Sequence, residues 1–188
     1  EHGLAQIRNI YANFVRVAPV NLLFAGVLER LLEGAEPGDQ APPEPEPPLP
    51  AMLPAMPRLP PHPHLEESAG QVLMRLATVL GGQPFVPGLY RLLAAWPAYL
   101  AHVATLVEPE LKSPVQRERR RQTADCIVDA ADEILRGLPP LQARYAPPDS
   151  RTANAVISAI MTYRVTSPEM IVFGSLLQAT LPEVSNLD

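Results

Sequence analysis

The sequence is poor in cysteine, with Cys126 as the only one among its 188 residues. A single cysteine excludes a disulfide within the chain and every redox or zinc motif that needs two cysteines. We therefore expect a protein of a reducing compartment, the cytoplasm. Because apolar Ile127 follows Cys126, we also expect the thiol to lie in the core and not to act as a nucleophile.

Positive charge is scarce. The chain has 15 Lys and Arg against 20 Asp and Glu, a net charge of −5, and Lys112 is its only lysine. The one dense cationic run, residues 117–121, is interrupted by Glu118 and has no aromatic residues between its arginines. We therefore expect no nucleic-acid partner.

Long apolar runs and metal-ligand clusters are also missing. No window approaches the roughly 18 uninterrupted apolar residues of a membrane-spanning helix, and the N-terminal stretch EHGLAQIRN does not resemble a signal peptide. We expect a soluble protein without a membrane partner. His62 and His64 lack a third ligand nearby, and Asp125, Asp129 and Asp132 fit a solvated helix face, so we expect neither a metal nor a cofactor.

Proline, in contrast, is abundant and concentrated. Twelve of the 24 prolines lie between Pro37 and Pro63, where neither a helix nor a sheet ladder can run because proline has no N–H. The composition predicts an extended linker over residues 35–63, with one helical region at 1–34 and a second at 64–188. A proline-rich ligand for another domain is the alternative reading of the linker.

Outside the linker, apolar residues recur at spacings of three and four, which predicts an all-α protein. Proline is expected to mark helix starts at Trp96-Pro97 and Ser113-Pro114 and to break the pattern at Pro19 and Pro168. The predicted helices are 4–17, 21–34, 65–82, 98–107, 114–137, 152–165 and 168–181.

An internal repeat emerges when Pro19 is aligned with Pro168. Phe24 then meets Phe173 without a gap, and both copies read as a helix, a proline break and a second helix. We expect tandem pseudo-symmetric helical repeats in which Gly3–Leu32 and Thr152–Leu181 are equivalent. Chance similarity between amphipathic helices is the alternative.

The stretch YRLLAAWP, residues 90–97, followed by an amphipathic helix and by EILRGLP at 133–139, resembles the second repeat of the group I 2-haloacid dehalogenases, the DehI-type family. The resemblance is specific in this block, and weaker but collinear from about Gly3 to Glu183. It implies an all-helical fold of two repeats around a pocket. It also implies hydrolysis of the carbon–halogen bond of a short 2-halocarboxylate by an activated water.

The resemblance carries the family's catalytic positions onto apolar residues. The aspartate that activates water corresponds to Leu89, its polar neighbour to Gly88, and the asparagine that orients the water to Ala18. Glu169 is the nearest carboxylate that could replace the missing base. The other pocket positions implied are Asn21, Pro87, Tyr163, Thr166, Ser167 and Met170, of which Tyr163 keeps its family chemistry.

Two functions follow from this pattern. The first is a hydrolase acting on carbon–halide bonds, with Glu169 as a displaced base and a small carboxylate as ligand. The second is a non-catalytic helical module that binds a small molecule or dimerises. Arg16 and Arg164 flank the two prolines and are candidates to bind a carboxylate. Because the first repeat lacks its beginning, we expect its apolar faces to be covered in a homo-oligomer or by absent upstream sequence.

Overall fold

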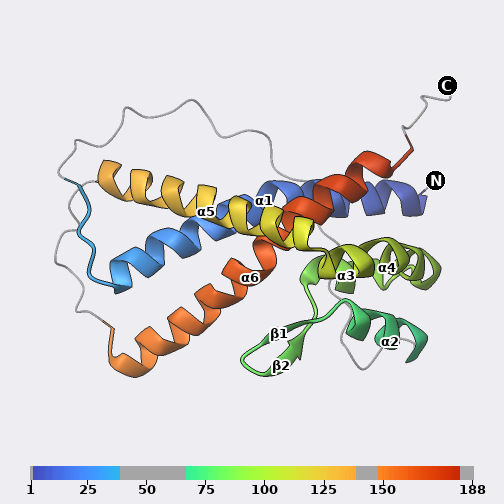
Figure 1. The fold of residues 1–188 in the computed structure, drawn as a ribbon, viewed down its shortest axis with the longest axis horizontal. Helices are drawn as coiled ribbons and strands as arrows, with labels where there is room; N and C mark the ends of the chain where they lie inside the picture. The colour runs from blue at the N-terminus through green and yellow to red at the C-terminus, as the bar shows by residue number, and fades with distance from the viewer. Residues whose placement is uncertain (1, 39–66, 139–147, 183–188) are drawn as a thin grey trace. The chain divides into compact units, whose positions relative to one another are not determined.

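The computed structural model describes residues 2–38, 67–138 and 148–182, of which 81% are helical (Figure 1). The prediction of a mainly helical protein is therefore confirmed. The helices are α1 His2–Leu32, α2 Glu67–Arg75, α3 Gly88–Leu93, α4 Pro97–Lys112, α5 Pro114–Gly137 and α6 Ser150–Thr180, and the strands are β1 Thr78–Leu80 and β2 Gln83–Phe85.

The described residues form two compact units. Unit 1 contains residues 2–17, 67–119 and 169–182, and unit 2 contains residues 18–38, 120–138 and 148–168. Helices α1, α5 and α6 each contribute residues to both units. The predicted regions 1–34, 35–63 and 64–188 remain predictions, because residues 39–63 of the expected linker lie outside the described residues.

The predicted breaks at Pro19 and Pro168 are wrong. Both prolines lie inside continuous helices, α1 and α6, which are 31 residues long each. A proline inside a helix removes one backbone hydrogen bond and crowds the preceding turn, but packing on both sides can outweigh that cost. Ala18 and Leu22 are buried on α1, and Ser167 and Met170 on α6. The repeat relation between the two segments remains a prediction.

The predicted end of α1 at a glycine is confirmed. Gly34 has a φ of +87°, the left-handed conformation that favours glycine. Its N–H donates to the carbonyl of Leu31, and the N–H of Ala35 donates to the carbonyl of Arg30 at 2.9 Å. This pair of bonds is a Schellman motif, which satisfies the last carbonyls of a helix.

The predicted helix 65–82 is wrong over its second half. After α2 ends at Arg75, the chain forms an antiparallel hairpin in which Leu80 pairs with Gln83 across a Gly81-Gly82 turn. Both glycines have positive φ, as a two-residue type I′ turn requires. The two glycines therefore close a hairpin instead of ending a helix.

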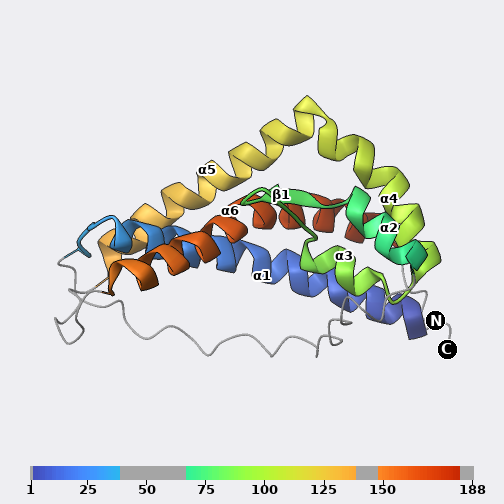
Figure 2. The ribbon, with the colours of Figure 1, turned by 90° about the horizontal axis from the view of Figure 1, so that it is seen from below.

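The helix starts at Pro97 and Pro114 are confirmed. Trp96 is the N-cap of α4, and the chain changes direction between α4 and α5, as Figure 2 shows. The indole of Trp96 lies against α1, since a Cβ built on Gly3 would stand 3.0 Å from its Nε1 atom. Helix α5 ends at Gly137 as predicted, but Cys126 is exposed, so its assignment to the core is wrong.

Each unit has its own apolar core. In unit 1, helices α2, α3 and α4 pack together and bury the side chains of Leu73, Leu76, Leu89, Leu93, Leu100 and Val103. In unit 2, small residues bring α1 and α5 close, because a Cβ on Gly26 would stand 2.9 Å from the Cβ of Ala131. The core of unit 2 also includes Leu22, Ala25, Leu135 and Ile160.

Candidate functional site

The residues implied by the dehalogenase resemblance divide between the two units. Unit 1 holds Pro87, Gly88, Leu89, Glu169 and Met170. Unit 2 holds Ala18, Asn21, Tyr163, Thr166 and Ser167.

The two positions where the family has polar catalytic residues are packed as core. Leu89 is fully buried in unit 1, and Ala18 is 5% exposed in unit 2. Gly88 lies against the ring of Phe14, whose Cζ would be 3.2 Å from an added Cβ. A leucine and an alanine have no group that accepts a proton or orients a water, so both positions contribute apolar packing.

A buried carboxylate of α6 contacts α3. Glu169, at 2% exposure, accepts a hydrogen bond from the phenol of Tyr90, with 2.9 Å between the Tyr90 hydroxyl oxygen and Oε1. Tyr90 directly follows Leu89 in the sequence, so the carboxylate of α6 contacts the helix that carries the position corresponding to the family's base. Burying a carboxylate is costly unless hydrogen bonds compensate it, and the Tyr90 phenol supplies one of them.

The remaining pocket positions of unit 2 differ in exposure. Tyr163 is 44% exposed, whereas Thr166 and Ser167 are buried. The hydroxyl of Thr166 donates to the carbonyl of Thr162 at 2.7 Å, within its own helix. The Thr166 hydroxyl is therefore engaged by the backbone, a common arrangement for threonine inside a helix.

A partly buried polar contact in unit 1 joins two tyrosines. The hydroxyls of Tyr11 on α1 and Tyr99 on α4 are 3.1 Å apart. Burial, reinforced by this hydrogen bond, raises the pKa of Tyr11 well above its ordinary value. The Tyr11 phenol therefore stays neutral and links the two helices. The sequence pattern did not single out this pair, since both residues read as ordinary apolar positions.

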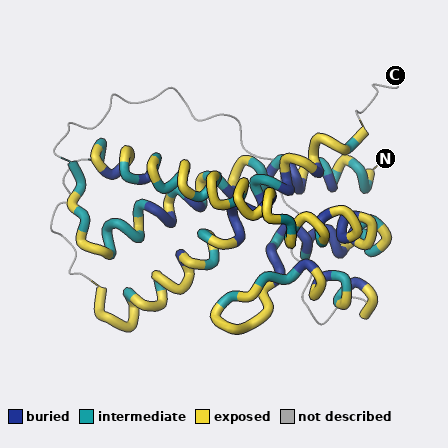
Figure 3. The backbone as a smooth tube through the Cα atoms, viewed as in Figure 1, coloured by how far each residue is buried: buried dark blue, intermediate teal, exposed yellow. Residues whose placement is uncertain are grey.

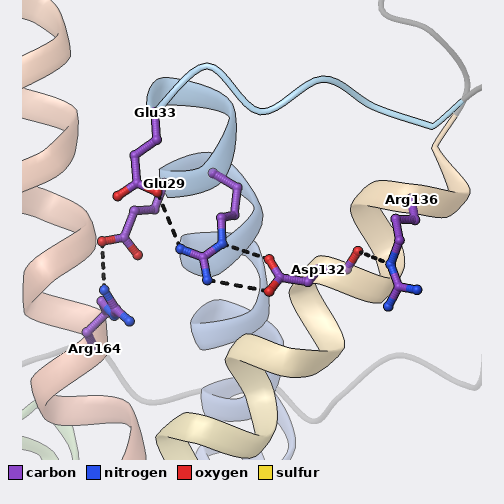
Figure 4. Close-up of polar contacts among 6 residues, drawn as sticks. Glu29, Glu33, Asp132, Arg136 and Arg164 are labelled. Atoms are coloured by element: carbon purple, nitrogen blue, oxygen red, sulfur yellow. Dashed lines mark hydrogen bonds and ion pairs between the residues drawn. The ribbon is translucent and has the colours of Figure 1, made fainter.

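Arg164, a predicted carboxylate binder, already has a carboxylate partner. In unit 2 its guanidinium donates to Glu29 of α1 at 2.6 Å, as Figure 4 shows. Glu29 is the less exposed partner, with 15% of its side chain accessible. This ion pair ties α6 to α1. Arg16, the other predicted carboxylate binder, is exposed in unit 1.

Arg30, which follows Glu29 on α1, makes a similar link to α5. Its Nε and Nη2 atoms donate to the two carboxylate oxygens of Asp132 at 2.7 and 3.4 Å (Figure 4). The hydrogen bond from Arg30 holds the pKa of Asp132 below its usual range. Two adjacent residues of α1 thus pair with two different helices.

Metal ligands do not gather in the part of the chain that the structure describes. Residues 2–38, 67–138 and 148–182 contain no group of three or more His, Cys, Asp or Glu that could hold an ion. Asp125 forms an ion pair with Arg121 at 2.6 Å, as expected for a solvated helix face. His62 and His64 lie outside the described residues.

Among the described helices, α1 is long and apolar enough to cross a membrane by its length and composition. A core helix of a soluble protein meets the same criterion, and α1 contributes Ile10, Tyr11 and Leu22 to the buried interior. The expectation of no membrane partner remains a prediction.

Comparisons of the chain with protein-family models, curated proteins and solved structures find no match.

The Tyr90–Glu169 contact predicts a stability effect. We expect Tyr90→Phe to lower the free energy of unfolding by about 1–3 kcal/mol, because it removes a hydrogen bond to a buried carboxylate. Urea unfolding followed by circular dichroism measures the change. Tyr163→Phe is the matched control, since its exposed hydroxyl should change stability by less than about 0.5 kcal/mol. Equal effects of the two variants would show that the buried contact contributes nothing.

The Arg30–Asp132 pair predicts a pH dependence. Because the pKa of Asp132 is lowered in the folded state, its ionised form stabilises the fold above the unfolded pKa. That contribution is lost as the pH falls through the folded pKa. We expect the stability difference between the wild type and Asp132→Asn to be largest near neutral pH and to vanish in strong acid. Exposed Asp129→Asn, on the same helix, is the control and should show no such trend.

Proposed function

We propose that this chain is a non-catalytic helical module that associates with a second copy of itself through apolar helix faces of unit 2. The observation that carries the proposal is a stripe on α1. Val20, Phe24 and Leu28 follow one another at spacings of four and are 47%, 64% and 44% exposed. Residues 17–28 contain no charged side chain. A soluble helix normally presents charged or polar side chains on its outer face.

Helix α6 repeats this feature in the same unit. Ile157, Met161 and Val165 are exposed at spacings of four, and residues 152–163 carry no charge. Ile160 is buried and Arg164 pairs with Glu29 of α1, so the outer side of this segment is mainly apolar. Figure 3 shows this half of α6 as largely exposed. An apolar helix face of this length is typical of an interface.

A second copy is the partner that these faces favour. An interface with two-fold symmetry sets one patch against the same patch of the partner, so a charge that lies on the axis meets its own copy. The two faces avoid that repulsion because they have no charges. The homo-oligomer expected from the sequence agrees with this reasoning.

Under this proposal, the chain shares the helical architecture that the dehalogenase resemblance implies but does not carry out the dehalogenase reaction. Support comes from Leu89 and Ala18, which pack as core at the positions where a catalytic base and a water-orienting amide are expected. The usual proton acceptor is therefore missing from the position that the reaction needs.

Association predicts a concentration-dependent mass. We expect light scattering to find an oligomer, and Phe24→Glu to weaken association at least tenfold, because burying a carboxylate costs more than about 1.4 kcal/mol. Val115→Glu is the matched control, since Val115 is 61% exposed on α5 but belongs to no apolar stripe. A wild type that is monomeric at all concentrations would contradict the proposal.

The second candidate function is hydrolysis of a carbon–halide bond, and the observation that favours it is the buried carboxylate of Glu169. As a displaced general base, its carboxylate would take a proton from a water while the water oxygen attacks C2 of a 2-halocarboxylate and the halide leaves with the bonding electrons. The phenol of Tyr90 would hold the carboxylate in place. The product would be the corresponding 2-hydroxycarboxylate.

Halide release separates the two functions. For the non-catalytic module, we expect no chloride release from either enantiomer of 2-chloropropionate, because an unactivated water is too weak a nucleophile. If chloride is released, the hydrolase is supported. Glu169→Gln should then abolish the release, and Glu110→Gln, an exposed carboxylate of α4, should leave it unchanged.

A further inference from the structure

The β1–β2 hairpin of unit 1 is exposed and uncharged. Residues 76–90 contain no charged side chain, and Val79 is 71% exposed, the largest value among the exposed large hydrophobic residues. Figure 1 shows the hairpin turn projecting beyond α2 and α3, and Figure 3 shows most of the hairpin as exposed. The two free edges of such a ribbon are sites where another strand can pair.

The two edges are chemically different. Leu80 and Gln83 flank the two-residue turn and form its hydrogen-bonded pair, so the next pair, Val79 and Pro84, is a non-hydrogen-bonded pair whose backbone groups point outward. On β2 that outward position is occupied by Pro84, which has no N–H to offer. On β1 it is occupied by Val79, which offers both an N–H and a carbonyl.

The outward backbone groups of Val79 have no backbone partner in the part of the chain that the structure describes. Across residues 2–38, 67–138 and 148–182, no backbone hydrogen bond outside the hairpin uses the N–H or the carbonyl of Val79. The edge of β1 therefore presents one donor and one acceptor beside an exposed β-branched side chain, the features that strand addition uses.

We propose that β1 pairs antiparallel with β1 of a second copy about a two-fold axis at Val79. The N–H of each Val79 then donates to the carbonyl of the other, and the two valine side chains meet on one face of the sheet. The result is a four-stranded sheet in the order β2, β1, β1, β2. Its outer edges are the two β2 strands, and Pro84 ends the sheet there.

The absence of charge favours a second copy as the occupant. A strand paired with itself sets each residue opposite its own copy or a near neighbour, and like charges placed directly opposite destabilise a sheet. The neutral stretch 76–90 avoids that conflict. The inference rests on the proposed self-association, and it names a second surface, separate from the helix faces of unit 2.

Disulfide trapping tests the pairing. In a Cys126→Ser background, Val79→Cys should give a disulfide-linked dimer under mild oxidation, because a hydrogen-bonded pair has Cα atoms about 5.5 Å apart, within disulfide range. Gln83→Cys is the matched control on β2. Its two copies would be separated by three strand spacings, roughly 14 Å, and should not be linked. Non-reducing electrophoresis should show the first variant linked at least about ten times faster than the second.

Two further variants probe the edges without cysteine. Pro84→Val restores an N–H on β2, so we expect assemblies larger than those of the wild type by light scattering. Val79→Glu should reduce association, whereas Met74→Glu, an exposed residue of α2, should not.

The outcomes separate this inference from the proposed function. Equal linking of Val79→Cys and Gln83→Cys in a chain that remains oligomeric would overturn the β1 pairing and leave the helix-face association standing. A wild-type chain that is monomeric throughout would overturn both. Selective linking at Val79 that persists in Phe24→Glu would establish the hairpin as an interface of its own.

Discussion

Proline lacks a backbone N–H, and the effect of each proline on the fold depends on where that missing donor falls. At Pro97 and Pro114 the absence costs nothing, because the first N–H groups of a helix have no partner within it. At Pro84 the absence falls on the outer side of β2, away from the ladder. Inside α1 and α6 it removes a helical bond that packing must outweigh.

Local chemistry explains which parts of the fold could be predicted. The ends of α1 and α5 and the starts of α4 and α5 depend on one or two residues, such as Gly34 and Pro97, and were predicted correctly. Whether the helix continues through Pro19 depends on the residues that are buried before and after it. A rule based only on neighbouring residues in the sequence does not include that burial. The hairpin was missed because apolar spacing beyond Arg75 fits a helix as well as a strand.

Side-chain partners were harder to predict than elements. Glu169 was singled out from its place beside Pro168, but its contact with Tyr90 joins residues 79 positions apart. Arg164 was singled out as a carboxylate binder from its place near Pro168, but its partner Glu29 lies 135 positions away. Ionic and hydrogen-bonded contacts over such separations depend on how the helices pack, and the spacing of residues within one helix does not contain that information.

The adjacent residues Glu29 and Arg30 also have charges that match the observed arrangement of the three helices of unit 2. Three helices can be arranged around one another in two mirror-related senses. In the observed sense, Glu29 faces Arg164 of α6 and Arg30 faces Asp132 of α5. Exchanging α5 and α6 would set two carboxylates together on one side of α1 and two guanidinium groups together on the other. A dipeptide of opposite charges thereby favours one chirality of the three-helix arrangement over its mirror-related alternative.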